Sequence, residues 1–201
     1  MRTIRIALQA TLVTLLLTGV AYPLAMTGVA RVLFPGKSAG SLVTDAHGKV
    51  VGSELIGQVF TNPGYFQGRP SAAGNGYDAT ASAGSNFGPT SKKLRDRVLA
   101  DVERLKEENP DAPMPIPAEL VTASASGLDP HLGPAAASWQ VARVAKARGV
   151  AVERVRQLVD DLTEGRQLGF LGEPRVNVLA LNMALDRQFG EPARPAAAQH
   201  P

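Results

Sequence analysis

The histidine in Asp129-Pro130-His131 is the first candidate for acid–base or metal chemistry, since His47 falls in a predicted turn and His200 near the C-terminus. Asp129 and His131 alone would under-ligate zinc, which takes three or four protein ligands. The chain has no cysteine, which excludes thiolate nucleophiles, disulfides and Cys-based zinc sites. We therefore predict no metal site and interpret 129–131 as a turn before a helix, with Asp129 capping and His131 hydrogen-bonded locally.

A glycine-rich segment, 84–93, runs into the start of a predicted helix at 91–108 and is the candidate for nucleotide binding. A P-loop needs Gly-Lys-Ser/Thr in that order, so that the lysine and the hydroxyl reach phosphate and magnesium. Here the order differs, and Pro89 removes a backbone N–H donor. A capped, packed loop is favoured; the alternative is that Ser85, Lys92 and Lys93 contact a nucleotide. No Gly-x-Ser-x-Gly nucleophile elbow is present, so we predict no catalytic residue and no cofactor bound by a recognisable motif.

The elements that position these residues begin with an uncharged stretch at 6–30, between Arg5 and Arg31. As a helix it would span about 37 Å, more than the ~30 Å hydrocarbon core of a bilayer. This length favours a retained transmembrane helix; the alternative is a cleaved signal peptide, whose apolar core has only about 7 to 15 residues. Pro23 predicts a kink or helix end near the membrane interface.

Two features of this helix leave alternatives open. Thr11, Thr14 and Thr18 share one helix face, which either packs on a partner helix or bonds back to its own backbone. The flanking side-chain charges are equal in number, and the terminal amine tips the prediction towards a cytoplasmic N-terminus.

Charge along the chain argues against a nucleic-acid partner. The formal net charge is +3, but four of the 21 basic residues and none of the 18 acids lie within 1–37. The rest of the chain is close to neutral, whereas nucleic-acid binders concentrate Lys and Arg on the folded domain. The basic residues are better explained as flanks of a membrane segment in contact with lipid.

After a linker at 35–40, short β-favouring runs at 41–44 and 49–51 predict a hairpin around 45–48. Residues 55–60 predict either a third strand or a short helical turn. The stretch 62–90 has no period but holds four aromatic residues, which predicts an ordered loop on the domain surface.

Four helices are predicted at 91–108, 134–148, 152–164 and 177–189, the second from Pro134 in its first turn and the others from their apolar residues, and a strand at 119–121 is predicted after a proline-rich connector. Gly149 is placed to close the second helix and Asn177 to cap the fourth. The fold class is α+β: one N-terminal transmembrane helix (1–34), a linker (35–40), a single extracytoplasmic domain (41–190) with a small sheet and about four helices, and a flexible tail (191–201).

Five blocks of sequence, in this order, carry a resemblance to a known family. They are GSELIGQ at 52–58, YFQGRPS at 65–71, GSN at 84–86, SASGLDPHL at 124–132 and LGEPRVNVL at 171–179. Together with the preceding single span they resemble KdpC, the single-span subunit of the bacterial ATP-driven potassium import complex.

The resemblance implies three partners: a channel-like potassium-translocating subunit, a P-type ATPase subunit and a small hydrophobic subunit. It implies an accessory, non-catalytic role in assembly and as a catalytic chaperone that raises the ATP affinity of the P-type subunit. It also implies a single-pass protein of the inner membrane with a periplasmic domain. Since ATP is cytoplasmic, such a domain cannot touch it, and we expect indirect coupling, with ATP present only in the complex.

The expected partner-facing surfaces are the 62–90 loop and the 124–131 turn, represented by Gly68, Arg69, Pro70, Ser71, Gly127, Asp129, Pro130 and His131. Two other classes of function stay open at this point. One is a nucleotide-binding chaperone that uses Ser85, Lys92 and Lys93. The other is an independent membrane-tethered periplasmic binding protein or hydrolase.

Overall fold

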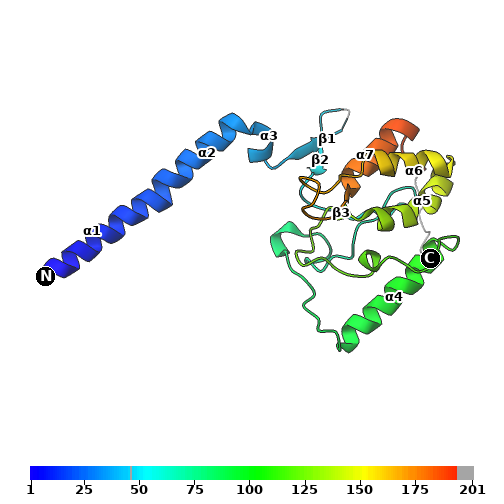
Figure 1. Ribbon diagram of the computed structural model, residues 1–201, viewed down its shortest axis with the longest axis horizontal. Coiled ribbons are helices and arrows are strands. Elements are labelled where there is room, and N and C mark those ends of the chain that lie inside the picture. The colour runs from blue at the N-terminus through cyan, green and yellow to red at the C-terminus, as the bar shows by residue number, and fades with distance from the viewer. Residues whose placement is uncertain (46, 194–201) are drawn as a thin grey trace, which may run out of the picture. The chain divides into compact units, whose positions relative to one another are not determined.

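The computed structural model describes residues 1–45 and 47–193 and is α+β, as predicted (Figure 1). The chain divides into two compact units, Met1–Ser53 and Glu54–Pro201. The hairpin that we assigned to the domain beginning at residue 41 therefore falls in the first unit. Most of the tail predicted at 191–201, including His200, lies outside the described residues.

One long apolar helix dominates the first unit. It comprises α1 (Arg2–Leu16), a π-helical turn η1 (Leu17–Ala21) and α2 (Tyr22–Leu33). Arg2–Leu33 has 32 residues, and its most apolar 18-residue stretch has a mean hydropathy of 1.7, so it is long and apolar enough to cross a membrane; none of its side chains is buried in the chain itself.

We expected Pro23, the second residue of α2, to kink or end this helix, but the chain remains helical on both sides of it. Proline lacks the N–H that would bond to the carbonyl four residues earlier, and its ring crowds that carbonyl. The wider π turn immediately before it accommodates both effects. On the threonine face, Thr18 Oγ1 donates to the carbonyl of Thr14 (2.8 Å), so this hydroxyl bonds back to its own helix.

The linker and hairpin follow in the same unit. A single helical turn, α3 (Pro35–Ser38), occupies the predicted linker. Strands β1 (Leu42–Thr44) and β2 (Val50–Ser53) pair antiparallel, which confirms the hairpin. The Asp45 carboxylate closes the turn by accepting from the backbone N–H groups of His47 (2.8 Å) and Lys49 (2.9 Å).

Four α-helices form the frame of the second unit, as predicted. They are α4 (Lys92–Glu108), α5 (Pro134–Arg148), α6 (Val152–Asp161) and α7 (Val178–Phe189). The side chains of Ser91 and Asn177 cap α4 and α7, and Gly149 ends α5 in the left-handed conformation (φ +65°). The third helix ends at Asp161 rather than Glu164.

The core of this unit lies around α5. Helix α6 packs against both α5 and α7, and the three helices gather together (Figure 1). Their apolar faces enclose Val141, Val155, Val159 and Leu181, each less than 2% exposed. We estimate that a fully buried side chain of this size contributes about 1.5–3 kcal/mol relative to an exposed one.

Two sequence predictions in this unit need correction. Residues 119–121 do not form a strand: they belong to a 3-10 turn, η3 (Ala118–Leu120), and its end. Residues 55–60 form neither a third strand of the hairpin nor a helical turn. The small sheet of this unit is instead made by β3 (His131–Leu132) and β4 (Val176–Asn177), paired antiparallel.

The 62–90 loop is irregular apart from the 3-10 turn η2 (Ala79–Ala81). We expected this loop to lie on the domain surface. Instead, Phe66 is fully buried in the core and Ala73 is also buried. The first part of this loop is therefore a structural element of the domain.

Candidate functional site

The two segments that we predicted to face a partner lie against each other. Residues 68–71 and 124–131 are called the loop–turn junction below. Ser71 Oγ donates to the carbonyl of Gly127 (2.6 Å) and accepts from the backbone N–H of Tyr77 (2.8 Å). The Tyr77 hydroxyl in turn donates to the carbonyl of Arg69 (2.7 Å). These contacts bring together segments more than 50 residues apart in the chain.

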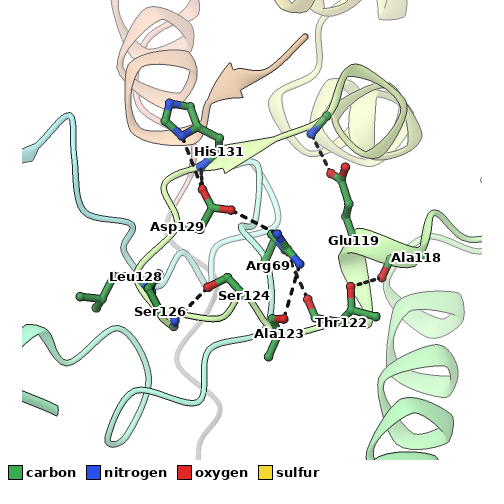
Figure 2. Close-up of polar contacts among 12 residues, drawn as sticks. Arg69, Ala118, Glu119, Thr122, Ala123, Ser124, Ser126, Leu128, Asp129 and His131 are labelled. Atoms are coloured by element: carbon green, nitrogen blue, oxygen red, sulfur yellow. Dashed lines mark hydrogen bonds and ion pairs between the residues drawn. The ribbon is translucent and has the colours of Figure 1, made fainter. Parts of the chain in front are cut away.

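Asp129 is the centre of the junction (Figure 2). Its Oδ2 lies 3.2 Å from Arg69 Nη1, and its Oδ1 accepts from the backbone N–H of His131 (3.0 Å), with His131 Nδ1 at 3.4 Å. Arg69 also donates to the carbonyls of Thr122 (3.3 Å) and Ala123 (3.5 Å). Each charged group of the junction thus has more than one partner within the chain.

The role expected for Asp129 is only partly right. It does hold His131 locally, as predicted, but the turn that it closes precedes β3 rather than a helix. Helix α5 begins one residue after Gly133, which has no capping side chain of its own. The backbone N–H of Gly133 donates instead to Glu119 Oε2 (2.7 Å), a contact drawn in Figure 2.

Electrostatics fix the protonation states in the junction. The hydrogen bond from the His131 side chain, together with the His131 backbone N–H and the charge of Arg69, lowers the pKa of Asp129 against the opposing effect of burial. Burial, followed by the negative charge of Asp129, raises the pKa of Tyr77 to about 12. At neutral pH Asp129 is therefore an anion and Tyr77 a hydrogen-bond donor.

The raised pKa of Tyr77 predicts that the domain loses stability at alkaline pH. The unfolded pKa of tyrosine is about 10, and the folded value is raised for both Tyr77 and Tyr65, to about 12. The contribution of these two protonated tyrosines to the free energy of unfolding is fully present below about pH 10. It is lost as pH rises towards 12, because the tyrosines of the unfolded chain release their protons at lower pH than those of the folded chain. We expect Tyr77→Phe to lose less stability than the wild type between pH 9 and 11.5.

The measurement is urea unfolding of the full-length chain in detergent at both pH values. Arg143, whose pKa is lowered to about 10 mainly by burial, titrates in the same range with the opposite sign. Its effect is common to wild type and variant and cancels in their difference. An equal loss of stability in both proteins would contradict the role assigned to Tyr77.

A groove of about 340 Å³ opens beside the junction. Arg69, Asp129 and His131 line it together with residues of both charges, among them Glu119, Glu173 and Arg175. Within residues 1–45 and 47–193, no group of three or more His, Cys, Asp or Glu residues is arranged to hold a metal ion. The groove thus presents charged groups and hydrogen-bonding atoms at the surface of the domain.

The three residues of the nucleotide hypothesis occupy two environments. Ser85 is half-buried next to Gly84, where an added Cβ would lie 2.8 Å from the carbonyl oxygen of Ala125. Lys92 and Lys93 are exposed in the first turn of α4, behind the Ser91 cap. The 84–85 segment is therefore packed on the 124–131 turn, and a nucleotide contact by these residues stays a prediction.

Sequence reasoning missed two buried amides that position the loop. Gln140 of α5 accepts from the backbone N–H of Gln67 (2.9 Å) and donates to its carbonyl (3.0 Å). Asn182 of α7 does the same for Phe66 (2.8 and 2.9 Å). We call Gln140 and Asn182 the amide clamp. Both side chains supply the loop with the paired contacts that a neighbouring β-strand would otherwise give.

Two arginines extend the clamp towards the start of the loop. Arg143 Nη1 donates to the carbonyl of Pro63 (2.6 Å), and Arg148 Nε donates to that of Gly64 (2.6 Å). Arg148 also pairs with Asp186 (2.8 Å) and lies over the ring of Tyr65, 5.0 Å from its centroid. The available signal in the sequence was a polar residue among the apolar residues of two predicted helices, Gln140 in 134–148 and Asn182 in 177–189.

The fold and the junction together define an α+β protein with one apolar N-terminal helix and a domain whose long loop is fixed by helical side chains. A family model described as "K+-transporting ATPase, c chain" (KdpC) matches residues 4–187. The chain belongs to this family, which confirms the resemblance seen in the sequence.

Individual relatives agree with the family model. A protein of Myxococcus xanthus named "Potassium-transporting ATPase KdpC subunit" is 66% identical over 184 residues, covering 92% of this chain and 87% of the relative. A protein of the same name from Rhodospirillum rubrum is 57% identical over 189 residues, covering 94% and 97%. A third, from Koribacter versatilis, is 56% identical over 176 residues, covering 88% and 90%.

Proposed function

We propose that this chain is a non-catalytic accessory subunit of the potassium-transporting ATPase, held in the inner membrane by Arg2–Leu33 with its N-terminus in the cytoplasm and its domain in the periplasm. It assists assembly with the channel-like, P-type ATPase and small hydrophobic subunits and raises the ATP affinity of the P-type subunit. The observation that carries the proposal is the long apolar helix, none of whose side chains is buried within the chain. Such a helix requires lipid or partner helices around it.

The effect on ATP follows from linkage without a nucleotide site in this chain. If the subunit binds the ATP-bound conformation of its partners more tightly than the ATP-free one, it raises ATP affinity by the same factor. The effect then depends on differential contacts with the partners, and a periplasmic domain can provide these through the shared membrane region. Direct contact by Ser85, Lys92 and Lys93 is the competing explanation.

The experiment compares the complex purified with and without this chain and measures potassium-stimulated ATPase activity against ATP concentration. We expect a lower KM for ATP when the chain is present, and an unchanged KM in the Lys92→Gln/Lys93→Gln variant. Equal KM values for ATP with and without the chain would contradict the proposal that it raises the ATP affinity of the P-type subunit. Photo-crosslinking of an ATP analogue to this chain within the complex would favour the nucleotide-binding alternative.

For the loop–turn junction we predict that Asp129→Asn reduces recovery of the other subunits with a tagged full-length chain by severalfold. The substitution removes the charge that Arg69 meets at 3.2 Å and leaves a half-buried guanidinium without its anion. The matched control is Asp111→Asn, which removes an acid whose side chain is 74% exposed and so makes the same charge change outside the junction. Equal recovery of both variants would count against the junction as a partner surface.

The independent binding protein or hydrolase makes the opposite prediction for the same purification. A tagged chain recovered alone, from a membrane that also contains the other subunits, would support that alternative. Hydrolytic activity of the purified chain would support it further.

A further inference from the structure

The chain between α6 and β4 forms a hairpin with an apolar end. Backbone bridges join Glu164 to Arg175 and Gln167 to Leu171, and we call residues 164–175 the 164–175 hairpin. At its tip, Leu168, Phe170 and Leu171 are 83%, 68% and 48% exposed. Elsewhere in the described domain, large exposed apolar residues occur singly along the sequence, at 55, 59, 87, 99 and 114. Three such side chains within four residues make a contact surface rather than ordinary surface composition.

The backbone at the tip supports this view. Leu168 adopts φ +52°, a left-handed conformation in which the Cβ of any L-residue is crowded by the backbone. Its side chain projects into solvent, so packing within the chain does not offset the strain. Glycine would form the same turn with less strain. The leucine side chain is therefore useful only to something outside the chain.

Charge at the tip favours a protein partner over a lipid surface. Arg175 pairs with Glu164 (2.9 Å) and Arg166 with Glu173 (2.5 Å), so both arginines of the hairpin are neutralised within it. Membrane-surface segments combine apolar residues with basic groups that attract anionic headgroups. This hairpin has no unpaired basic side chain to do so and presents an uncharged end.

The hollows of a second copy of this chain are also poor sites for the tip. Three hollows of the described domain contain charged side chains: Arg104 in one, Asp129 in another and Arg143 in the third. Filling any of them with apolar side chains would strip water from these charges without giving new partners.

We propose that the tip of the 164–175 hairpin inserts into an uncharged, apolar pocket on another subunit of the potassium-transporting ATPase. This inference rests on the proposed function and adds to it a contact made by the tip, which lies outside the loop–turn junction and its groove. Leu168 and Phe170 are the side chains that enter the pocket, and the ion-paired stem holds them in place.

The first test is the double substitution Leu168→Gly/Phe170→Ser in the tagged full-length chain. Glycine suits the left-handed backbone at 168, so the thermal midpoint of the variant should stay at or above that of the wild type. We expect recovery of the other subunits at limiting concentration to fall by about tenfold or more. The matched control is Leu99→Gln, at a residue of α4 that is 53% exposed. Recovery equal to wild type, or an equal loss in the control, overturns the proposal.

The second test identifies the partner by placing a photoreactive benzophenone amino acid at position 170 in membranes that contain all subunits. We expect an adduct with another subunit of the ATPase. An adduct with lipid alone, an adduct with a second copy of this chain, or no adduct overturns the proposal. If the wild-type chain recovers the other subunits but neither of these two tests gives the expected result, only this inference fails. If the wild-type chain recovers none of the other subunits, the proposed function fails as well.

Discussion

Replacing Asn182 with alanine is expected to lower the free energy of unfolding by about 4 kcal/mol. The substitution leaves the buried N–H and C=O of Phe66 without partners, at about 1–3 kcal/mol each, and also opens a small cavity. Trp139, the single tryptophan and a buried core residue, reports unfolding of the domain by fluorescence in urea. The control is Asn75→Ala, which removes an exposed amide and should change stability by no more than about 0.5 kcal/mol.

Combining this change with Gln140→Ala tests whether the amide clamp acts as a unit. Phe66 and Gln67 are neighbours in the chain, so loss of one clamp residue already loosens the segment that the other one holds. The double variant should therefore lose less stability than the two single variants together. Strict additivity, or a loss below about 1 kcal/mol for Asn182→Ala, would contradict the clamp.

Gly127→Ala is expected to cost about 3 kcal/mol in the same measurement. Gly127 has φ +68°, and a Cβ there would lie 2.7 Å from the backbone N of Ala73 and 2.7 Å from the carbonyl O of Ala83. The left-handed conformation accounts for about 1–2 kcal/mol and the crowding of backbone for the rest.

Gly149→Ala separates these two causes. Gly149 has nearly the same conformation, φ +65°, but nothing lies within 4 Å of an added Cβ. We expect this control to lose only about 1–2 kcal/mol, the cost of the conformation alone. Similar losses at both positions would mean that the backbone around Gly127 moves aside, and that the loop–turn junction is less rigid than its contacts suggest.

The helices could be predicted because their boundaries are encoded locally. Ser91, Gly149 and Asn177 occupy the caps that their residue types favour, and each marks an end within one residue of the structure. The strand expected at 119–121 was wrong because three residues carry little periodic signal, and a hydrogen bond from Leu120 N–H back to Pro117 forms a tight turn instead.

The site was only partly predictable for a different reason. Arg69 and Asp129 were chosen as site residues, but their contact joins positions 60 residues apart, and no local pattern specifies it. The amide clamp depends on separations of 73 and 116 residues. The sheet of β3 and β4, with two residues in each strand, is too short to show alternation in the sequence.

The π-helical turn at Leu17–Ala21 also affects how the apolar helix meets its surroundings. A turn of this kind holds about one extra residue, which rotates everything beyond it by roughly 100° relative to an uninterrupted α-helix. The face that carries Thr11 and Thr14 in α1 is therefore not continued by residues at ordinary helical spacing in α2. A neighbouring straight helix would contact the threonine face along one half of the apolar helix and a different face along the other. The apolar helix thus presents differently oriented faces on its two halves.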